Sequence, residues 1–269
     1  MPRHLMTVYI VSNFRVLFGC ELVSNLLFLY FHAGLSIAAK GLQNAWLLKE
    51  SMESIFVILI KLGEDPPRAK GDSTLKAEFE AMNKELQERS DESLLNMQQA
   101  NDKKLVTLHR LYADLAHVVH FTKPGLIGSV ACRMIELTMK NGITPTAPLS
   151  FAYHGEILAS TGKIEEGCRL GRLALKMVEK NPSSSKYKPV VILLCHQLIL
   201  WYVEPLQSTA QAHQAGYKAG QQLGDFLYSI WNLQLSLTLG YISGQNLFTI
   251  QSACKDYIEK RLAEKQQNL

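Results

Sequence analysis

Apolar residues recur along this chain with the spacing of α-helices. From residue 40 onward they fall three and four positions apart over segments of about 15 to 20 residues, the period of a helix with one apolar face. Strand signals, in which apolar and polar residues alternate between tight Asn-Gly or Asp-Gly hairpin turns, are missing. The pattern therefore predicts an all-α protein.

Proline, glycine and asparagine interrupt this pattern and set the limits of the expected helices. Asp65-Pro66-Pro67, Lys123-Pro124-Gly125 and Asn141-Gly142 are the clearest interruptions. We expect helices over residues 42–62, 74–90, 93–100, 104–121, 126–140, 146–160, 164–180, 190–203, 206–223, 226–242 and 247–264.

The starts of these helices suggest a repeat. First helices of successive pairs begin near residues 150, 188 and 226, an interval of 38 residues, and an earlier pair begins near residue 104. A helix-turn-helix unit of this period is typical of a helical solenoid, in which each pair packs against its neighbours. We therefore expect a right-handed, tetratricopeptide-like solenoid of antiparallel helix pairs rather than an irregular helical bundle.

Small residues support close packing between these helices. Glycine inside a helix costs about 1 kcal/mol relative to alanine, so its repeated use indicates positions where two helices approach closely. The expected packing positions are Gly155, Gly162, Gly167, Gly171, Ala174, Gly216, Gly220 and Gly224.

Three parts are expected along the chain. Residues 1–40 form an apolar segment, residues 41–103 a helical pair with a charged linker helix, and residues 104–269 the repeats. Within the first part, residues 16–39 carry one charged side chain, Glu21, and are long enough to span a bilayer. Because Glu21 and several polar residues are costly in hydrocarbon, we favour a buried helix pair, with a membrane anchor as the alternative.

Charge and cysteine content narrow the class of protein. With 28 basic and 24 acidic residues the net charge is +4, too small and too evenly spread to indicate a nucleic-acid partner. The five cysteines include no closely spaced pair, which argues against a disulfide framework or a zinc site. Four of them lie in apolar helical patterns, where cysteine behaves as a small hydrophobic residue. We expect an intracellular, cytoplasmic protein.

Histidines are the main candidates for chemistry. His109, His117 and His120 all fall on the side of one helix that we expect to be polar, where a metal site would need further ligands from another helix. We interpret them as surface and boundary residues, with a metal site as the alternative. His154 and His196 lie in apolar helices and are expected to be core histidines with hydrogen-bond partners.

Catalytic motifs are missing from the sequence. It contains no phosphate-binding loop, no GxSxG elbow, no HExxH and no kinase catalytic loop. The loop acids Glu64, Asp65 and Glu204 have no evident partner. We therefore expect a protein without enzymatic activity, cofactor or metal.

Four aromatic residues offer a candidate binding surface. Trp201, Tyr202, Tyr228 and Trp231 lie at helical spacing around one expected helix pair. Core packing explains them in the simplest way, and a groove for a protein partner is the sharper hypothesis.

Residues 135–180 carry a resemblance to a known family. The stretch IELTMKNGITPTAPLSFAYHGEILASTGKIEEGCRLGRLALKMVEK is similar to the tetratricopeptide-like repeat region of very large signalling proteins. In these proteins a serine/threonine kinase-like domain and an AAA ATPase domain precede the repeats, and a histidine-kinase or cyclase module often follows. The resemblance extends over roughly residues 42–250, with Leu223-Gly224-Asp225 and Tyr228 similar to the family's next helix junction.

The resemblance implies a helical-repeat scaffold that binds a protein partner or transmits signals between neighbouring domains. This chain lacks the kinase, ATPase and histidine-kinase modules, and residues 1–40 do not resemble the family's preceding repeats. We expect a fragment of such a signalling protein or a repeat protein that stands alone.

Overall fold

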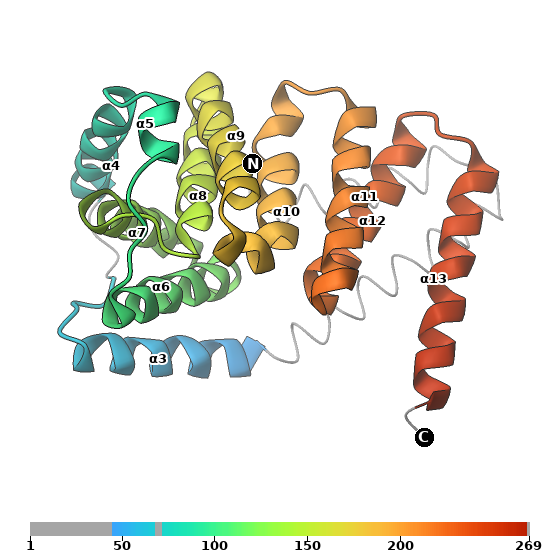
Figure 1. The fold of residues 1–269 in the computed structure, drawn as a ribbon, viewed down its shortest axis with the longest axis horizontal. Coiled ribbons are helices and arrows are strands. Elements are labelled where there is room, and N and C mark those ends of the chain that lie inside the picture. Colours follow the sequence, from blue (N-terminus) through green and yellow to red (C-terminus); the bar gives the residue numbers. More distant parts are fainter. Residues whose placement is uncertain (1–44, 68–71, 268–269) are drawn as a thin grey trace. The chain divides into compact units, whose positions relative to one another are not determined.

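A computed structural model describes residues 45–67 and 72–267 of the chain (Figure 1). This part contains eleven α-helices, three 3-10 helices and no β-strand, which confirms the expected all-α class. The α-helices are α3 (Ala45–Lys61), α4 (Asp72–Gln87), α5 (Asp91–Leu95), α6 (Lys103–Thr122), α7 (Ile127–Asn141), α8 (Ala147–Ser160), α9 (Ile164–Lys180), α10 (Lys188–Leu198), α11 (Leu206–Leu223), α12 (Phe226–Ile242) and α13 (Leu247–Gln267). The 3-10 helices are η1 (Pro124–Leu126), η2 (Pro182–Tyr187) and η3 (Leu200–Tyr202).

The predicted helix limits differ most from the structure in two places. The helix expected over residues 190–203 ends at Leu198, because Ile199 leaves the helical conformation with φ −125° and ψ −64°. The helix expected over residues 93–100 is α5, which ends at Leu95. Residues after α5 are extended, and Gln99 forms an isolated parallel bridge with Ile143.

The chain divides into two compact units, Met1–Trp46 and Leu47–Leu269. The expectation for residues 16–39, a buried helix pair or a membrane anchor, lies outside the described residues. Among the helices that the structure does describe, none has the length and apolar character needed to cross a membrane.

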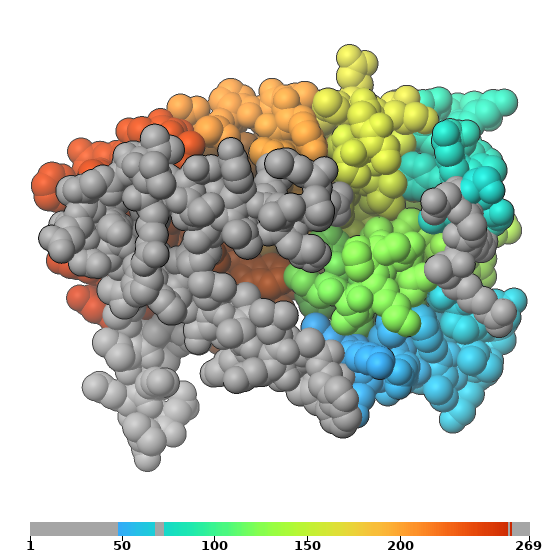
Figure 2. Space-filling model, turned by 180° about the vertical axis from the view of Figure 1, so that it is seen from behind, coloured from blue at the N-terminus to red at the C-terminus, as the bar shows by residue number. Residues whose placement is uncertain are grey.

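Within the second unit, neighbours in sequence are neighbours in space. From α6 to α13 each helix packs against the next, and α8 also packs against α10 and α10 against α12. Figure 2 shows the same order as a progression of colours from blue and teal through green and yellow to orange and red. The helices expected to begin successive pairs are α6, α8, α10 and α12, which start at Lys103, Ala147, Lys188 and Phe226. Only α10 and α12 start 38 residues apart, so the expected constant interval is not found.

A continuous apolar core joins α3 to η3. Its fully buried members include Leu59 of α3, Leu115 of α6, Phe151 of α8 and Leu173 of α9. The cysteines Cys132, Cys168, Cys195 and Cys254 are all buried. This agrees with the expected role of these four cysteines as small core residues.

Several glycines lie where two helices approach closely. A Cβ atom placed on Gly167 of α9 would lie 2.6 Å from the carbonyl oxygen of Gly155 on α8. On α11, a Cβ atom at Gly220 would lie 2.6 Å from the Cβ of Ser229, and one at Gly216 would lie 2.5 Å from Oδ1 of Asn232. α8 and α9 therefore pack backbone against backbone at Gly155 and Gly167, and α11 approaches the backbone of α12 at Gly220, whereas the side chain of Asn232 packs on Gly216.

Two of the expected packing glycines have a different role. Gly162 and Gly224 adopt positive φ values of 95° and 71°, and no atom lies within 4 Å of a Cβ placed on either residue. They end α8 and α11 in turns that favour glycine. Ala174 is fully buried in α9.

Candidate protein-interaction surface

The turn between α10 and α11 is built around the buried side chain of Ile199. Its Cδ1 atom lies 3.2 Å from a Cβ placed on Gly155 and 3.3 Å from one placed on Gly171. Glycines at these two positions therefore leave a hole on α8 and α9 that Ile199 fills. Leu200 is also buried, so the chain is anchored just before the turn.

Three consecutive large side chains follow this anchor and are exposed. Trp201 and Tyr202 are 37% and 45% exposed, with ring centroids 5.0 Å apart, and Val203 is 50% exposed. The next residue, Glu204, turns back: its carboxylate lies 3.7 Å from Nη2 of Arg172 and 3.4 Å from Nδ1 of His196. The anchored turn thus presents an aromatic pair at a fixed place on the surface.

A second exposed apolar group lies on the same edge of the unit. The turns between α10 and α11 and between α12 and α13 are both at the upper edge in Figure 1, and Nε2 of Gln207 donates to the Ser243 carbonyl at 3.4 Å. Ile242, Leu247 and Phe248 in the second turn are 49%, 50% and 81% exposed.

We call the two groups together the turn surface: Trp201, Tyr202, Val203, Ile242, Leu247 and Phe248. The sequence analysis missed its second half. The available signal was a cluster of large apolar residues directly flanking the Ser243-Gly244 break, a place where a turn leaves side chains in water.

The four aromatic residues singled out in the sequence fall into two separate pairs. Tyr228 and Trp231 pack against each other on α12 with ring centroids 5.7 Å apart and are half-buried. They face α6, where Tyr228 hydrogen-bonds Nδ1 of His117 at 2.7 Å and Trp231 contacts the ring of Phe121. Among the described residues no ring contact joins this pair to Trp201 and Tyr202.

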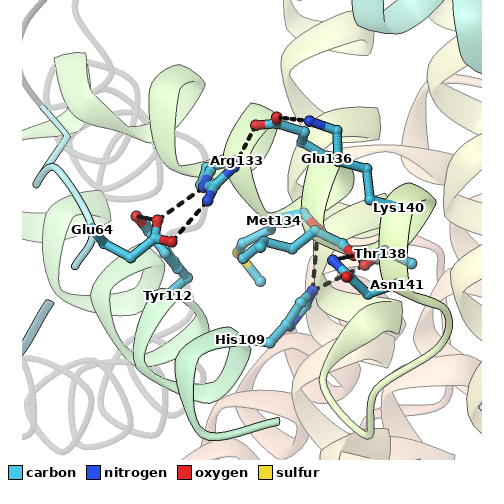
Figure 3. Close-up of polar contacts among 10 residues, drawn as sticks. Glu64, His109, Tyr112, Arg133, Met134, Glu136, Thr138, Lys140 and Asn141 are labelled. Carbon is cyan, nitrogen blue, oxygen red and sulfur yellow. Dashed lines mark hydrogen bonds and ion pairs between the residues drawn. The ribbon is translucent and has the colours of Figure 1, made fainter. Parts of the chain in front are cut away.

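His109 is in the core, and its expected surface position was wrong. Its Nε2 lies 3.1 Å from the Met134 carbonyl, which can only accept, so this nitrogen carries the proton (Figure 3). Nδ1 then accepts from the Thr146 hydroxyl at 2.7 Å. Burial lowers the pKa of His109 to about 4, so a neutral imidazole ties α6 to α7 and to the start of α8.

Among the described residues, His109, His117 and His120 lie in no group of potential metal ligands. His117 and His120 are half-buried, and no group of three or more potential ligands capable of holding a metal ion occurs in the part of the chain that the structure describes.

Of the two expected core histidines, His154 is buried and His196 is half-buried, and their expected hydrogen bonds are not found. His154 is fully buried, and neither ring nitrogen has a hydrogen-bond partner. Its ring is stacked on Phe79 of α4 with centroids 4.0 Å apart. Nδ1 of His196 is buried near Glu204 without hydrogen-bond geometry. Burial lowers the pKa of His154 to about 3 and that of His196 to about 4.

A polar junction holds α12 on the preceding helices. Asn232 is fully buried and accepts a hydrogen bond from Nδ1 of His213 on α11 at 2.8 Å. Its amide donates to the Pro189 carbonyl on α10 at 3.0 Å and to the Tyr228 carbonyl at 2.8 Å. One side chain therefore satisfies groups on three helices.

A network of charged and polar side chains joins the loop after α3 to α6 and α7. The Glu64 carboxylate accepts from Nη2 and Nε of Arg133 at 2.8 and 3.0 Å and from the Tyr112 hydroxyl at 2.9 Å (Figure 3). Arg133 also donates to Glu136, which accepts from Lys140. Burial raises the pKa of Glu64, but the hydrogen bonds from Arg133 and Tyr112 outweigh it and lower the pKa overall.

Glu64 and Glu204 were expected to be loop acids without partners, and both have them. Their basic partners lie far away in the sequence, in α7 for Glu64 and in α9 for Glu204. Spacing within the sequence gave no sign of either contact.

A small pocket of about 230 Å³ lies between the end of α9 and the extended segment after α5. Its wall includes Met177 and Ile143, and the amide of Asn181 donates to Gln99 at 3.0 Å. The one charged residue in the wall is Lys180, whose ammonium group is hydrogen-bonded to Asn96. The wall contains no acid–base pair and no nucleophile.

Comparison with known proteins gives no relative from which a function could be transferred: no family model, no curated protein and no solved structure matches the chain.

Proposed function

We propose that the chain is a non-catalytic helical-repeat scaffold that binds a protein partner through the turn surface. In this proposal α6–α7, α8–α9, α10–α11 and α12–α13 are the antiparallel pairs of a right-handed, tetratricopeptide-like solenoid. The serial packing from α6 to α13 supports it, as do the contacts of α8 with α10 and of α10 with α12, the first helices of neighbouring pairs.

The single observation that carries the proposal is the anchored aromatic turn. Tryptophan and tyrosine are enriched among residues that dominate binding energy at protein interfaces. Trp201 and Tyr202 are exposed on a turn. The turn is fixed by Ile199, whose side chain fills the space left by Gly155 and Gly171. A rigid turn loses little conformational entropy on binding, which favours affinity.

The resemblance to signalling kinases gives this scaffold a context. A neighbouring domain of a kinase and AAA ATPase protein, or a separate signalling protein, is the partner that we propose. The chain itself would hold no cofactor and would transmit or position rather than catalyse.

The test compares the proteins captured by three forms of the full chain from an extract of the cells that express it. The first is the unchanged chain. The second carries Trp201→Ala, Tyr202→Ala and Phe248→Ala in the turn surface. The third is a control with Val57→Ala, Ile58→Ala and Ile60→Ala, which removes comparable exposed apolar area from α3.

We expect a partner that is retained by the unchanged chain and by the control, and whose recovery falls at least about ten-fold with the turn variant, as for the loss of interface hot spots. Circular dichroism and thermal unfolding establish that all three chains are folded. Identical capture by the three chains would refute the turn surface as the binding site.

A further inference from the structure

Helix α4 does not belong to the serial order of the repeats and instead crosses three of their helices. Leu75 near its start packs 3.2 Å from a Cβ placed on Gly128 of α7. Phe79 in the middle is stacked on His154 of α8, and Asn83 donates to Oε2 of Glu166 on α9 at 2.6 Å. One short helix thus contacts α7, α8 and α9 in turn.

The apolar contacts come from one narrow face of α4, with Asn83 beside it. At 100° per residue, Leu75, Phe79, Met82 and Leu86 lie within an arc of about 60°. Their spacing of four, seven and eleven positions is that of an amphipathic helix lying in a groove. The opposite face, with Glu80 and Lys84, is exposed. α4 therefore packs on α7, α8 and α9 in the way that a helical ligand packs in the groove of a receptor.

Hydrogen bonds from Arg169 hold the carboxyl end of α4 on α9. Arg169 of α9 donates from Nη1 to the Leu86 carbonyl at 3.1 Å and from Nη2 to the Arg89 carbonyl at 2.6 Å. Its Nε donates to Oδ1 of Asp91 at 2.7 Å. The arginine thus adds donors to carbonyls at and just beyond the end of α4, where intrahelical donors run out; the Leu86 carbonyl also accepts from the Arg89 amide at 3.4 Å.

A buried polar side chain without hydrogen-bond partners, His154, lies beneath the middle of α4. Both ring nitrogens of His154 are buried without hydrogen-bond partners while the ring is covered by Phe79. A buried polar group without a partner opposes the state that buries it. Departure of α4 would open this face of His154 to water or to a partner's polar group.

We infer that α4 is a detachable internal ligand and that the groove beneath it on α7, α8 and α9 is a binding site for an amphipathic helix of a partner protein. The closed structure shows what such a partner must present. It needs an apolar row at positions i, i+4, i+7 and i+11, with an aromatic residue second in the row to stack on His154. A hydrogen-bond donor next to the third apolar residue would take the place of Asn83 opposite Glu166.

This site shares no residue with the turn surface, so the inference stands or fails independently of the proposed function. The groove would exchange one helix for another, and α4 would set the affinity that an outside helix must exceed.

The first experiment is hydrogen exchange on the unchanged full chain. Amides in the middle of α4 should exchange at least about ten-fold faster than those of α8 and α9, because α4 opens without unfolding the repeats. Phe79→Ala should raise the exchange rates in α4 by about a further ten-fold and leave the exchange rates in α11 and α12 unchanged. Lys84→Ala, on the exposed face of α4, is the matched control and should leave all of these rates unchanged.

The second experiment supplies α4 from outside. A fluorescent peptide of residues 72–91 should bind the full-length Phe79→Ala chain at least about ten-fold more tightly than the unchanged chain, whose groove is already occupied. The same peptide carrying Phe79→Ala and Leu86→Ala should lose this binding. Both chains are first compared by thermal unfolding to establish that they are folded.

Two results would overturn the inference. In the first, α4 exchanges at the same rate as α8 and α9 in the unchanged chain, which would make it part of one cooperative unit. In the second, the folded Phe79→Ala chain does not bind the unchanged peptide.

Discussion

At Gly167 the chain has no room for one additional carbon atom. A Cβ placed there would lie 2.6 Å from the Gly155 carbonyl oxygen and 2.8 Å from the Ala159 backbone nitrogen, and neither backbone atom can move without shifting α8. The spacing of small residues in the sequence indicates such positions, because glycine inside a helix needs a packing reason. It does not distinguish them from turn glycines such as Gly162, whose role depends on its φ value.

We predict that Gly167→Ala lowers the free energy of unfolding by about 1–3 kcal/mol, the usual cost of overpacking. The matched control is Gly125→Ala, because a Cβ at Gly125 meets no atom within 4 Å and the residue has no positive φ. The control should change stability by less than about 0.5 kcal/mol. Urea unfolding followed by circular dichroism measures both, and equal effects of the two substitutions would contradict the close approach of α8 and α9.

His109 illustrates what residue patterns miss. The helical spacing of the sequence predicts a polar face for His109, yet Tyr112, Ala113 and Ala116 around it are all buried. The hydroxyls that satisfy the ring come from Thr138 and Thr146, in α7 and just before α8. A buried polar residue is recognisable only when its partners are known, and those partners are 29 and 37 residues away.

On the scale of elements, the sequence predicts the helices well because their ends depend on local chemistry. The limits of α9, α11 and α12 agree with those expected, and Asp225 caps α12 by accepting from the Tyr228 amide at 3.1 Å. The prediction failed at the end of α10, where the conformation of Ile199 depends on a hole between α8 and α9. Two elements distant in sequence decide where that helix stops.

The loop after α3 offers a second element-scale test. Glu64 and Arg133 are 15% and 31% exposed and form two hydrogen bonds, so a double-mutant cycle with Glu64→Gln and Arg133→Met should give a coupling energy of about 1–2 kcal/mol. Arg110 and Asp114, 65% and 58% exposed and 4.0 Å apart on α6, are the control pair.

The control cycle, with Arg110→Met and Asp114→Asn, should give a coupling energy below about 0.5 kcal/mol, because exposed ion pairs are screened by water and salt. Urea unfolding of the four chains of each cycle supplies the values. If the cycle with Glu64 gave no larger coupling than the control, the loop would not be fastened to α7 by these charges.

On the scale of the whole molecule, buried histidines make the fold sensitive to acid. Burial disfavours the imidazolium ion and lowers the pKa of five histidines from the ordinary value of 6.5. They are His109, His196 and His213, each with a pKa of about 4, His154 with a pKa of about 3, and His117, whose pKa is lowered. The unfolded chain binds protons near pH 6.5 that the folded chain does not.

We therefore predict that the free energy of unfolding is largest above about pH 7 and falls as the pH drops below 6.5, by up to about 1.4 kcal/mol per pH unit for each of these histidines. The contribution of His109 should level off near pH 4 and that of His154 near pH 3, where the folded chain begins to take up the same protons. Urea unfolding between pH 7.5 and 5 at constant ionic strength measures the slope.

The variant His154→Phe isolates one of these contributions. It keeps an aromatic ring against Phe79, removes the titrating group and removes two unpaired nitrogens. Its stability should therefore depend less steeply on pH, by up to about 1.4 kcal/mol per pH unit. A slope equal to that of the unchanged chain would show that His154 is protonated in the folded state as readily as in the unfolded state.

The contacts of α4 also bear on the order in which the chain can be completed on a ribosome. Leu86 and Arg89 are bound by Arg169, which follows them by 83 and 80 residues, and Asn83 is bound by Glu166, 83 residues later. Helix α4 thus leaves the ribosome well before α9 has been synthesised. Successive helices from α6 onward can pack as soon as each pair has emerged, whereas α4 can contact α7 and α8 earlier but completes its contacts only when α9 has been made. The charged residues on the outer face of α4 keep this helix soluble while its apolar row is still uncovered.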